Sequence, residues 1–527
     1  MLLNKEGKLR KELIQLVSQV EGYNHMSFFK KKSIRSISNS PINESQLLTN
    51  DINKNIHSIR DYHCRTEDLM VRELIFNKNI CTIFYLDSMV NKDSLHSSVI
   101  GPIVETKYGE IQHIVKTTQV KFTSRISDVG SDLLDGFCII LRENNATAIS
   151  LSVVENTSRS IEEPDNERSI ISSHDGFIED IGTNIFLLRK RVKTPQLKVK
   201  YFSVGKLTNT KVSMVFIENL TDKKLIKEVE RRIGSIEVDQ LLSFGDIEDY
   251  IEDNPNSIFP QMLTTERPDR ATSYLTEGKI LLIVDGSPRI MIVPITFFAF
   301  YQSPDDYNSR WIIGTFFRLI RFLSFIVAIT FPAIYIAVVS YHSEVLPIGI
   351  LYSIRVSLEN VPFPPLIEAF AMQITLELLK EASIRLPTPI AQTTGIVGGL
   401  VIGTAVVEAS FVSNIMIVVI GLTAIASFVA PVNEMGTSAR LLGFPVMIAA
   451  SLFGFFGIVL VLMGIFMHLC KLQTFGTPYF APLAPFKMED IKDSIVRLSF
   501  WKLNSRPTDS KPIYKKQQWR TRGWKNN

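Results

Sequence analysis

The sequence predicts an α/β or α+β cytoplasmic head of two subdomains, followed by an α-helical transmembrane domain of about four spans plus an amphipathic or re-entrant helix. Three observations support this fold class. Polar and charged residues dominate positions 1–310, whereas apolar residues collect after Trp311. Four long stretches without Asp, Glu, Lys or Arg lie between Arg321 and Lys471. Strand-like and helix-like patterns alternate between Cys64 and Phe300, as in mixed folds.

The uncharged stretches are the strongest single signal. They run from Arg321 to His342, Arg385 to Glu408, Glu408 to Glu434, and Arg440 to Lys471. Each is long enough to cross a hydrocarbon core of ~30 Å as a helix. Four such stretches in succession indicate membrane insertion. Arg318 and Arg321 before the first span, and the basic residues after the last, favour a cytoplasmic side for both ends and an even number of crossings.

The pattern divides the chain into five parts. We expect a disordered basic arm (1–60), a small α/β subdomain (61–122), a second α/β subdomain (123–300), the transmembrane helical domain (310–470) and a cytoplasmic basic tail (471–527). The arm is predicted to be disordered because 27–60 is rich in Ser and Asn and poor in aromatic residues. The tail has eight Lys or Arg and one acid, Asp509, from Trp501 onward. A contact with anionic lipid and a solvated tail without a partner are equally compatible with that composition.

Three hairpins and one helix are predicted within the head. The strands pair 137–141 with 146–154, 198–204 with 211–218, and 279–284 with 289–293, and 80–86 is a buried strand. Asp285-Gly286 marks the turn of the third hairpin, the clearest of the three. Thr221 is expected to cap a helix whose apolar face carries Leu225, Ile226, Val229 and Ile233.

Several function classes are disfavoured. The head contains no GxxxxGK[ST], HExxH, GxSxG or GxGxxG pattern, so an enzyme is not expected. His174 next to Asp175 is more simply a solvated loop than a catalytic dyad. The four cysteines form no CxxC pair, which predicts no metal and no disulfide framework, and no cofactor is expected. A net charge of +4 gives no support for nucleic-acid binding.

Two features of the membrane region are candidate functional elements. Gln373, Glu377 and Glu381 fall on one helical face within 361–385, a segment too polar to span a membrane alone. Carboxylates beside a membrane pathway can select cations, although a solvent-facing stripe of an interfacial helix is the simpler interpretation. Gly395, Gly399 and Gly403 recur every four residues, a spacing that allows close helix packing and, in a channel, a thin wall near a pore.

A set of short strings distributed over roughly 76–486 resembles one family. Its members are Arg159-Ser160-Ile161-Glu162-Glu163-Pro164, Asp175-Gly176-Phe177, Tyr250-Ile251-Glu252-Asp253-Asn254-Pro255, Thr265-Glu266-Arg267-Pro268-Asp269, Pro294-Ile295-Thr296-Phe297-Phe298, Gln302-Ser303-Pro304-Asp305-Asp306-Tyr307, Val361-Pro362-Phe363-Pro364 and Phe475-Gly476-Thr477-Pro478-Tyr479. Together they resemble the A subunit of the nutrient germinant receptors of bacterial spores, the GerA spore germination protein family.

This resemblance implies a non-enzymatic, multi-pass protein of the spore inner membrane, with its N-terminal head and C-terminal tail on the core side. It further implies a transporter-like B subunit and a lipoprotein C subunit as partners, contact with membrane lipid, and a homo-oligomer that conducts ions when nutrients are detected. A membrane scaffold or signalling subunit without its own pore, and a solute transporter, stay open as alternatives. Two positions depart from the family pattern: Ser172-Ser173-His174 replaces a Gly-Pro-basic sequence, and Gln373 stands where an acid is usual.

Overall fold

The computed structural model describes residues 46–527 except 78, 107–108, 118, 155–163, 165–166, 168, 170, 519–520, 523 and 525–527. Within one helix, the side chains of 388–389, 391–392, 394–395, 397–398, 400 and 402 also lie outside the description. The predicted arm up to residue 45 is therefore not tested. Its last part differs from expectation, because Ile52–Tyr62 forms helix α2, capped by the Asp51 carboxylate and anchored by the buried Ile59.

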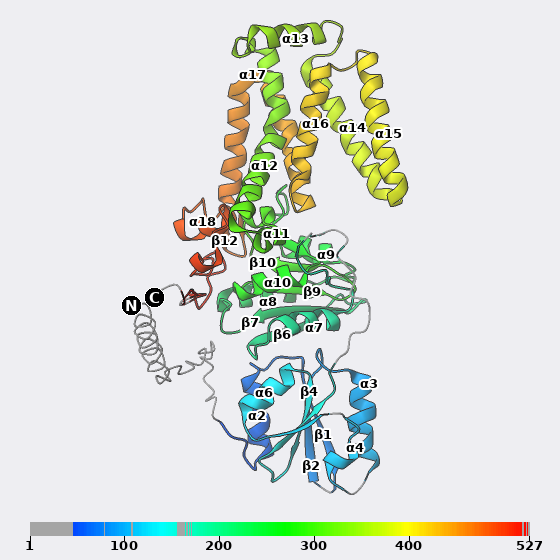
Figure 1. Cartoon of the computed structure of the whole chain (residues 1–527), viewed down its shortest axis with the longest axis vertical. Helices are drawn as coiled ribbons and strands as arrows, with labels where there is room; N and C mark the ends of the chain where they lie inside the picture. The colour runs from blue at the N-terminus through cyan, green and yellow to red at the C-terminus, as the bar shows by residue number, and fades with distance from the viewer. Residues whose placement is uncertain are drawn as a thin grey trace, which may run out of the picture. The chain divides into compact units, whose positions relative to one another are not determined.

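The first sheet has the strand order β1-β2-β4-β5-β3, with every neighbouring pair antiparallel. Its strands are β1 (Leu69–Phe76), β2 (Asn79–Leu86), β3 (Val120–Thr123), β4 (Phe137–Arg142) and β5 (Ala148–Ser152). Its helices are α2, α3 (Lys92–Leu95), the π-helical turn His96–Ile100, α4 (Gly101–Glu105), α5 (Ile111–Ile114) and α6 (Ile126–Leu134). Helices α2 and α6 lie on one face and α3 and α4 on the other (Figure 1).

The second sheet has the order β6-β7-β9-β10-β8 and is also antiparallel throughout. Its strands are β6 (Leu197–Val204), β7 (Thr210–Ile217), β8 (Leu263–Thr265), β9 (Ile280–Val284) and β10 (Ile290–Val293). Its helices are α7 (Ile181–Arg191), α8 (Lys223–Gly234), α9 (Phe244–Ile251) and α10 (Pro268–Thr276). The apolar sides of α8 and α9 pack on one face, while α7 and α10 pack on the opposite face.

The strand order of the two sheets moves the predicted boundary between the subdomains, and it contains the three predicted hairpins. Strands β3, β4 and β5 belong with β1 and β2, so the division between the two sheets falls after Ser152 and not near Phe122. The sequence placed it too early because 123–152 has the same alternating pattern as the strands that follow. All three predicted hairpins form. Helix α8 buries the four expected apolar residues, but its cap is Asp222 and not Thr221.

The helical region begins with α11 (Pro304–Asn308) and α12 (Trp311–Ser340), after a 3-10 turn at Phe297–Tyr301. It continues with a 3-10 turn at Ser343–Val345, α13 (Ile348–Leu358), α14 (Pro365–Arg385), α15 (Thr388–Glu408), α16 (Asn414–Phe428) and α17 (Asn433–Lys471). Among the described residues, two helices are long and apolar enough to cross a membrane, α12 and α17. The predicted count of four spans is not confirmed.

Helix α17 is not one straight element, because Gly454 has φ +59° and ψ −140°, outside the helical region. A Cβ atom there would lie 2.8 Å from Nε2 of His342, so only glycine fits. Both ends of α17 contact the head: Ser438 Oγ donates to the Ile258 carbonyl at 2.7 Å, and Ser257 Oγ lies 2.9 Å from Nε2 of His468. The segment therefore runs away from the head, turns at Gly454 and returns.

The other helices alternate in the same way. Ser413, at the start of α16, contacts Glu368 near the start of α14, whereas Phe428, at the end of α16, lies close to Lys380 near the end of α14. We call each helical segment that runs from one end of the helical region to the other a leg. The described helical region has six legs: α12, α14, α15, α16 and the two halves of α17. An even number of legs returns the chain to the side from which it left.

The tail folds back onto the head, an arrangement that the sequence did not predict. It contains β11 (Gln473–Thr474), β12 (Thr477–Pro478), α18 (Met488–Ser494) and a 3-10 turn at Phe500–Lys502. Tyr479 is fully buried and donates to the Pro260 carbonyl at 2.7 Å. Lys279 of the head forms an ion pair with Asp509 at 3.0 Å. Head and tail are therefore on the same side of the helical region.

Candidate functional site

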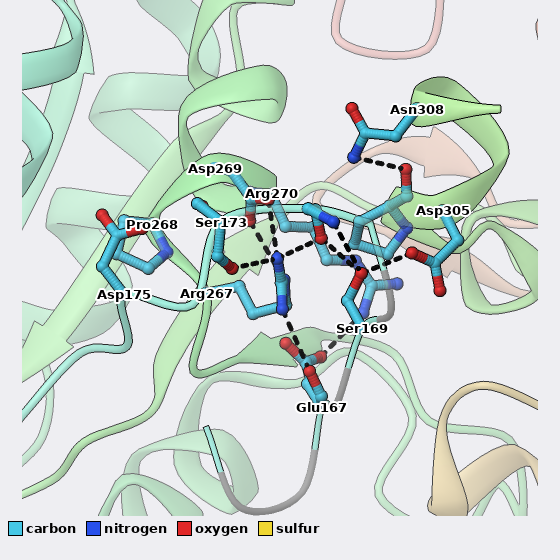
Figure 2. A network of polar contacts seen from close by, with 12 residues as sticks. Glu167, Ser169, Ser173, Asp175, Arg267, Pro268, Asp269, Arg270, Asp305 and Asn308 are labelled. Carbon is cyan, nitrogen blue, oxygen red and sulfur yellow. Dashed lines mark hydrogen bonds and ion pairs between the residues drawn. The ribbon is translucent and has the colours of Figure 1, made fainter. Parts of the chain in front are cut away.

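The junction of β8 and α10 carries the motif Glu266-Arg267-Pro268-Asp269. Pro268 occupies the first turn of α10, where a missing N–H costs nothing, and Arg267 is the N-cap residue. The Arg267 guanidinium is 2% exposed. It donates to the carbonyls of Ser173 (2.8 Å) and Glu167 (3.2 Å) and pairs with Asp269 at 2.8 Å (Figure 2). One buried cation thus fixes the loop before α7 against the start of α10.

Arg270 extends this network towards α11. Its Nη1 lies 2.8 Å from Oε1 of Glu167, and its Nη2 donates to the Gln302 carbonyl at 3.2 Å. The second Glu167 oxygen accepts a hydrogen bond from Thr265 at 2.5 Å. Ser169 donates to Asp305 in α11 (Figure 2). The loop 167–175, helix α10 and helix α11 therefore form one polar unit directly before α12.

The motif Glu252-Asp253-Asn254-Pro255 follows α9 and contacts the tail. One Asp253 oxygen pairs with Arg232 of α8 at 2.6 Å, and the other accepts from the backbone N–H of Phe475 at 2.7 Å. Arg232 also lies 4.3 Å from the centre of the Phe475 ring. Asn254 and Gln261 exchange hydrogen bonds of 3.0 and 2.7 Å across the turn that contains Pro255. Glu252 accepts a further one from the Gln261 amide at 3.2 Å.

The remaining motif residues are Glu162, Glu163, Pro164 and Glu266, and the structure describes two of them. Glu162 and Glu163 lie outside the described residues, and Pro164 is buried. Glu266 pairs with Arg289, which directly precedes β10, at 3.1 Å, and the Glu266 carbonyl accepts a hydrogen bond from the backbone N–H of Phe177. The described motif residues thus hold the second sheet, the loop before α7 and the tail together, and none of these contacts is by itself a catalytic arrangement.

An ionic cluster at the start of α12 was not predicted from the sequence. Asp306 of α11 is 2% exposed and lies 3.2 Å from Arg318 Nε and 2.8 Å from Arg321 Nη1. Arg318 also faces Asp493 of α18 at 3.6 Å. Gly314 permits this approach, because a Cβ there would lie 2.7 Å from the Asp306 carbonyl oxygen. Head, first apolar helix and tail therefore meet at one set of buried charges.

The sequence did contain a signal for this cluster. Two arginines three positions apart at the start of a long apolar helix need acidic partners once they are buried. Asp305-Asp306, in the preceding short helix, is the nearest acidic pair in the chain. Asp493 could not be found in this way, because it lies 175 positions after Arg318.

The structure separates the three predicted residues of α14. Gln373 is buried at 3% exposure. Glu377 forms an ion pair with Arg440 of α17 at 2.5 Å. Glu381 is exposed and pairs with Arg385 on its own helix at 2.6 Å. The one helical face predicted for them therefore runs from the interior of the helical bundle to its surface.

Sequence reasoning missed a buried acid on the same helix. Glu368 is 1% exposed, and its Oε2 accepts from the backbone N–H of Ser413 at 2.9 Å. Within the described part of the chain, neither Glu368 Oε1 nor Gln373 Oε1 has a hydrogen-bond partner. The first turn after Pro364-Pro365 could have drawn attention to Glu368, since an acid there favours the helix start.

The three glycines of α15 have no tested role. Gly399 and Gly403 have open space where a Cβ would stand, so none of the described residues packs closely against them. The surroundings of Gly395 lie outside the described side chains. The predicted packing role accordingly stays a prediction.

A cavity of about 340 Å³ lies where α10, α11 and the tail meet. Its walls include Arg270 and Tyr274 of α10, Tyr307 of α11, and Asp493 and Phe500 of the tail. The Asp175 carboxylate pairs with Arg191 at 2.5 Å. Among the described residues, no group of three His, Cys, Asp or Glu side chains is arranged to hold a metal ion.

The comparison with known proteins defines the family. Residues 57–509 match the family model described as Bacillus/Clostridium GerA spore germination protein. The chain belongs to this family. Spore germination protein KA of Bacillus subtilis (strain 168) is 36% identical over 88% of this chain and 87% of that protein. Spore germination protein A1 of the same strain is 40% identical over 69% of this chain and 76% of that protein.

Two further matches complete the comparison. The uncharacterized membrane protein YfkQ of Bacillus subtilis (strain 168) is 35% identical over 91% of this chain and 95% of that protein. The crystal structure of the N-terminal domain of the A subunit of the Bacillus megaterium spore germinant receptor GerK3 covers 48% of this chain and 99% of that domain. That match has 24% identity and a TM-score of 0.38. Membership of the GerA family confirms the resemblance found in the sequence.

Proposed function

We propose that this GerA-family chain is the A subunit of a nutrient germinant receptor in the spore inner membrane. It couples nutrient detection to the release of monovalent cations as an oligomeric ion-conducting element. Relatives over 87–88% of the chain carry the names spore germination protein KA and GerQA, which supports the germination role. The B and C subunits of the receptor and membrane lipid are its expected partners.

The observation that carries the conducting role is the polar interior of α14. Glu368 and Gln373 are almost fully buried among apolar helices, and each has an oxygen without a protein donor in the described structure. Buried polar oxygens inside a membrane bundle are costly and therefore mark functional positions. Oxygens that replace part of a hydration shell suit an alkali cation. Glu368, Gln373 and Glu377 then line the pathway, and Arg440 neutralises Glu377 while the pathway is closed.

The proposed topology places the head and the tail in the spore core. Their mutual contacts put both on one side of the helical region, and six legs return the chain to that side. Arg318 and Arg321 at the first leg and the basic tail favour the cytoplasmic side. Gly395, Gly399 and Gly403 on α15 are proposed to pack against a second copy of the chain, because no described residue of this chain fills the space beside Gly399 and Gly403.

The test is a cation-flux measurement on the full chain reconstituted with its B and C subunits. We expect Gln373→Leu and Glu368→Gln each to lower nutrient-triggered K⁺ release at least tenfold without loss of the protein from the membrane. Glu381→Gln is the matched control: it removes a charge from the exposed end of the same helix, and release should change less than twofold.

Other outcomes would favour the alternatives. A scaffold or signalling subunit without its own pore predicts that every α14 variant releases K⁺ normally. A solute transporter predicts that this chain alone accumulates a labelled nutrient in proteoliposomes, without the B and C subunits. Either result removes the conducting role, and the first leaves the receptor assignment in place.

A further inference from the structure

The cavity between α10, α11 and the tail exists only because the tail covers this part of the head. Tyr274 of α10 donates to the Gln302 side chain at 3.3 Å, and that side chain donates to the Asp493 carbonyl at 3.0 Å. Tyr307 of α11 donates to the Asp493 carboxylate at 3.1 Å. A volume of about 340 Å³ lies at the lower end of the range for small-molecule sites.

The walls combine aromatic rings with an excess of carboxylate. Tyr274, Tyr307 and Phe500 supply the rings. Four carboxylates of the partly buried wall are Asp269, Glu277, Asp490 and Asp493. The buried cation in the wall, Arg270, is already paired with Glu167. The two wall lysines, Lys492 and Lys502, are exposed at the rim. The interior therefore favours a positive guest.

Glu277 is a wall carboxylate whose charge is only partly compensated. Its nearest cation is Lys279 at 3.6 Å, and Lys279 lies closer to Asp509, at 3.0 Å. Burial raises the pKa of Glu277 to about 8, against the lowering effect of Lys279. The charged and titratable groups that face Glu277 are Lys279 just before β9, Tyr274 from α10, Tyr307 from α11, and Asp493, Arg506 and Asp509 from the tail.

We propose that this cavity binds a small organic cation with an ammonium head group. The ammonium lies beside Glu277 and Asp493, and the rings of Tyr274, Tyr307 and Phe500 contact its alkyl substituents and positive charge. An anion would face the wall carboxylates without a counter-charge inside the cavity. This proposal goes beyond the ion-conducting role and does not depend on it.

The position of the cavity links its occupant to the first apolar helix. Asp493 forms part of its wall and also faces Arg318 of α12 at 3.6 Å. A bound ammonium competes with Arg318 for the Asp493 carboxylate. Both head and tail contribute walls to the cavity, so a ligand makes its full set of contacts only when the tail is docked. It therefore binds the docked state more tightly than the undocked state, which is the requirement for a regulatory ligand.

The experiment measures binding of tetramethylammonium to the full chain in lipid nanodiscs by titration calorimetry. This probe keeps its charge at every pH, so any pH dependence comes from the protein. We expect saturable binding at pH 8.5, and no binding of acetate at the same concentrations. Glu277→Gln should weaken binding at least tenfold, whereas Asp135→Asn, at the corresponding helix end of the first sheet, should change it less than twofold.

The pH profile supplies an independent readout. A cation favours the ionised Glu277 carboxylate, so affinity should rise about tenfold between pH 7 and pH 9, in keeping with a pKa of about 8. Phe500→Leu should weaken binding several-fold without altering the profile. A thermal unfolding curve like that of the unmodified chain shows that each variant is folded.

Three results would overturn the proposal: no saturable binding of tetramethylammonium, equal binding of acetate, or an affinity indifferent to both Glu277→Gln and pH. Because the readout is binding and not flux, such a failure is distinct from a failure of the conducting role. If the chain conducts cations normally but does not bind tetramethylammonium, only the cavity proposal is overturned.

Discussion

The two sheets of the head share one topology but differ in what covers them. When strands are numbered within each sheet, both have the order 1-2-4-5-3, and a helix stands at the same places in the connections. Arg267 follows Arg125 by 142 positions, and Gly278 follows Gly136 by the same interval. Both arginines are N-cap residues, and both glycines have positive φ, +82° and +91°. The head is therefore an internal duplication.

The copies diverge at equivalent residues. Arg125 is exposed in the first copy, whereas Arg267 is buried in the second and holds the loop before α7. Asp135 caps the end of α6 at the surface and pairs with Lys193. Its counterpart Glu277 caps the end of α10 beneath the tail. At these two pairs of equivalent positions, the charged side chain is exposed in the first copy and largely covered in the second.

The largest expected difference between the copies concerns the two N-cap arginines. Arg267→Met leaves Asp269 and two buried carbonyls without their donor, and removing one partner of a buried pair costs about 3–5 kcal/mol. Arg125→Met should cost less than about 0.5 kcal/mol, as for other surface substitutions. Hydrogen exchange of the full chain, followed in peptides from 263–293 and 120–152, measures both. Equal effects would show that burial does not distinguish the copies.

The second prediction concerns His63, which follows α2 at the position that Val192 occupies after α7. Burial, reinforced by the Arg189 charge, lowers the pKa of His63 to about 3. The unfolded chain binds the proton below about pH 6.5, so this group destabilises the fold as pH falls from 6.5 towards 3. The loss should be about 2 kcal/mol at pH 5 relative to pH 7.

His63→Val makes the first copy resemble the second at this point. Hydrogen exchange of 52–86 gives the free energy of unfolding of this segment at pH 5 and at pH 7. In His63→Val the difference between the two values should be about 2 kcal/mol smaller than in the unmodified chain. The same comparison for 181–217 serves as the control and should be unaffected. An unchanged pH dependence in 52–86 would assign the acid sensitivity to another group.

A smaller effect is expected where the tail covers the second copy. Asp509→Asn leaves the buried Lys279 ammonium with Glu277 alone, 3.6 Å away. We expect this substitution to weaken docking of the tail by about 1.4 kcal/mol, which increases the population of chains with an undocked tail tenfold. Limited proteolysis of the full chain should then cut at Lys511, Lys515 or Lys516 about ten times faster. Glu489→Gln, an exposed tail acid, should leave the rate unchanged.

The smallest effect is expected at the exposed helix end of the first copy. The Lys193–Asp135 ion pair is 2.8 Å long, but both side chains are largely exposed, at 59% and 44%. Such pairs contribute about 0–1 kcal/mol. Lys193→Ala should therefore change the hydrogen exchange of 126–142 by less than about 0.5 kcal/mol. A loss as large as that of Arg267→Met would contradict the role assigned to burial.

Local patterns predicted the hairpins, because alternation and turn residues are read over a few positions. They did not reveal the duplication, since few residues, such as Arg125 and Arg267, recur across it. Gly454 was hidden within an uncharged stretch, so its turn was taken as part of one span. The docking of the tail was not predicted, because its partners, Lys279 and Arg318, lie far away in the sequence. Contacts between residues so far apart in the sequence depend on the topology of the fold, and the periodicity of apolar residues carries no information about topology.

The docked tail also sets an order of events during biosynthesis. Lys279 emerges from the ribosome 230 residues before Asp509, and every apolar helix lies between them. Until the tail has been translated, Lys279 has no Asp509 with which to pair, and the cavity has no wall on that side. The nascent head therefore reaches its described form only after the helical region has been made.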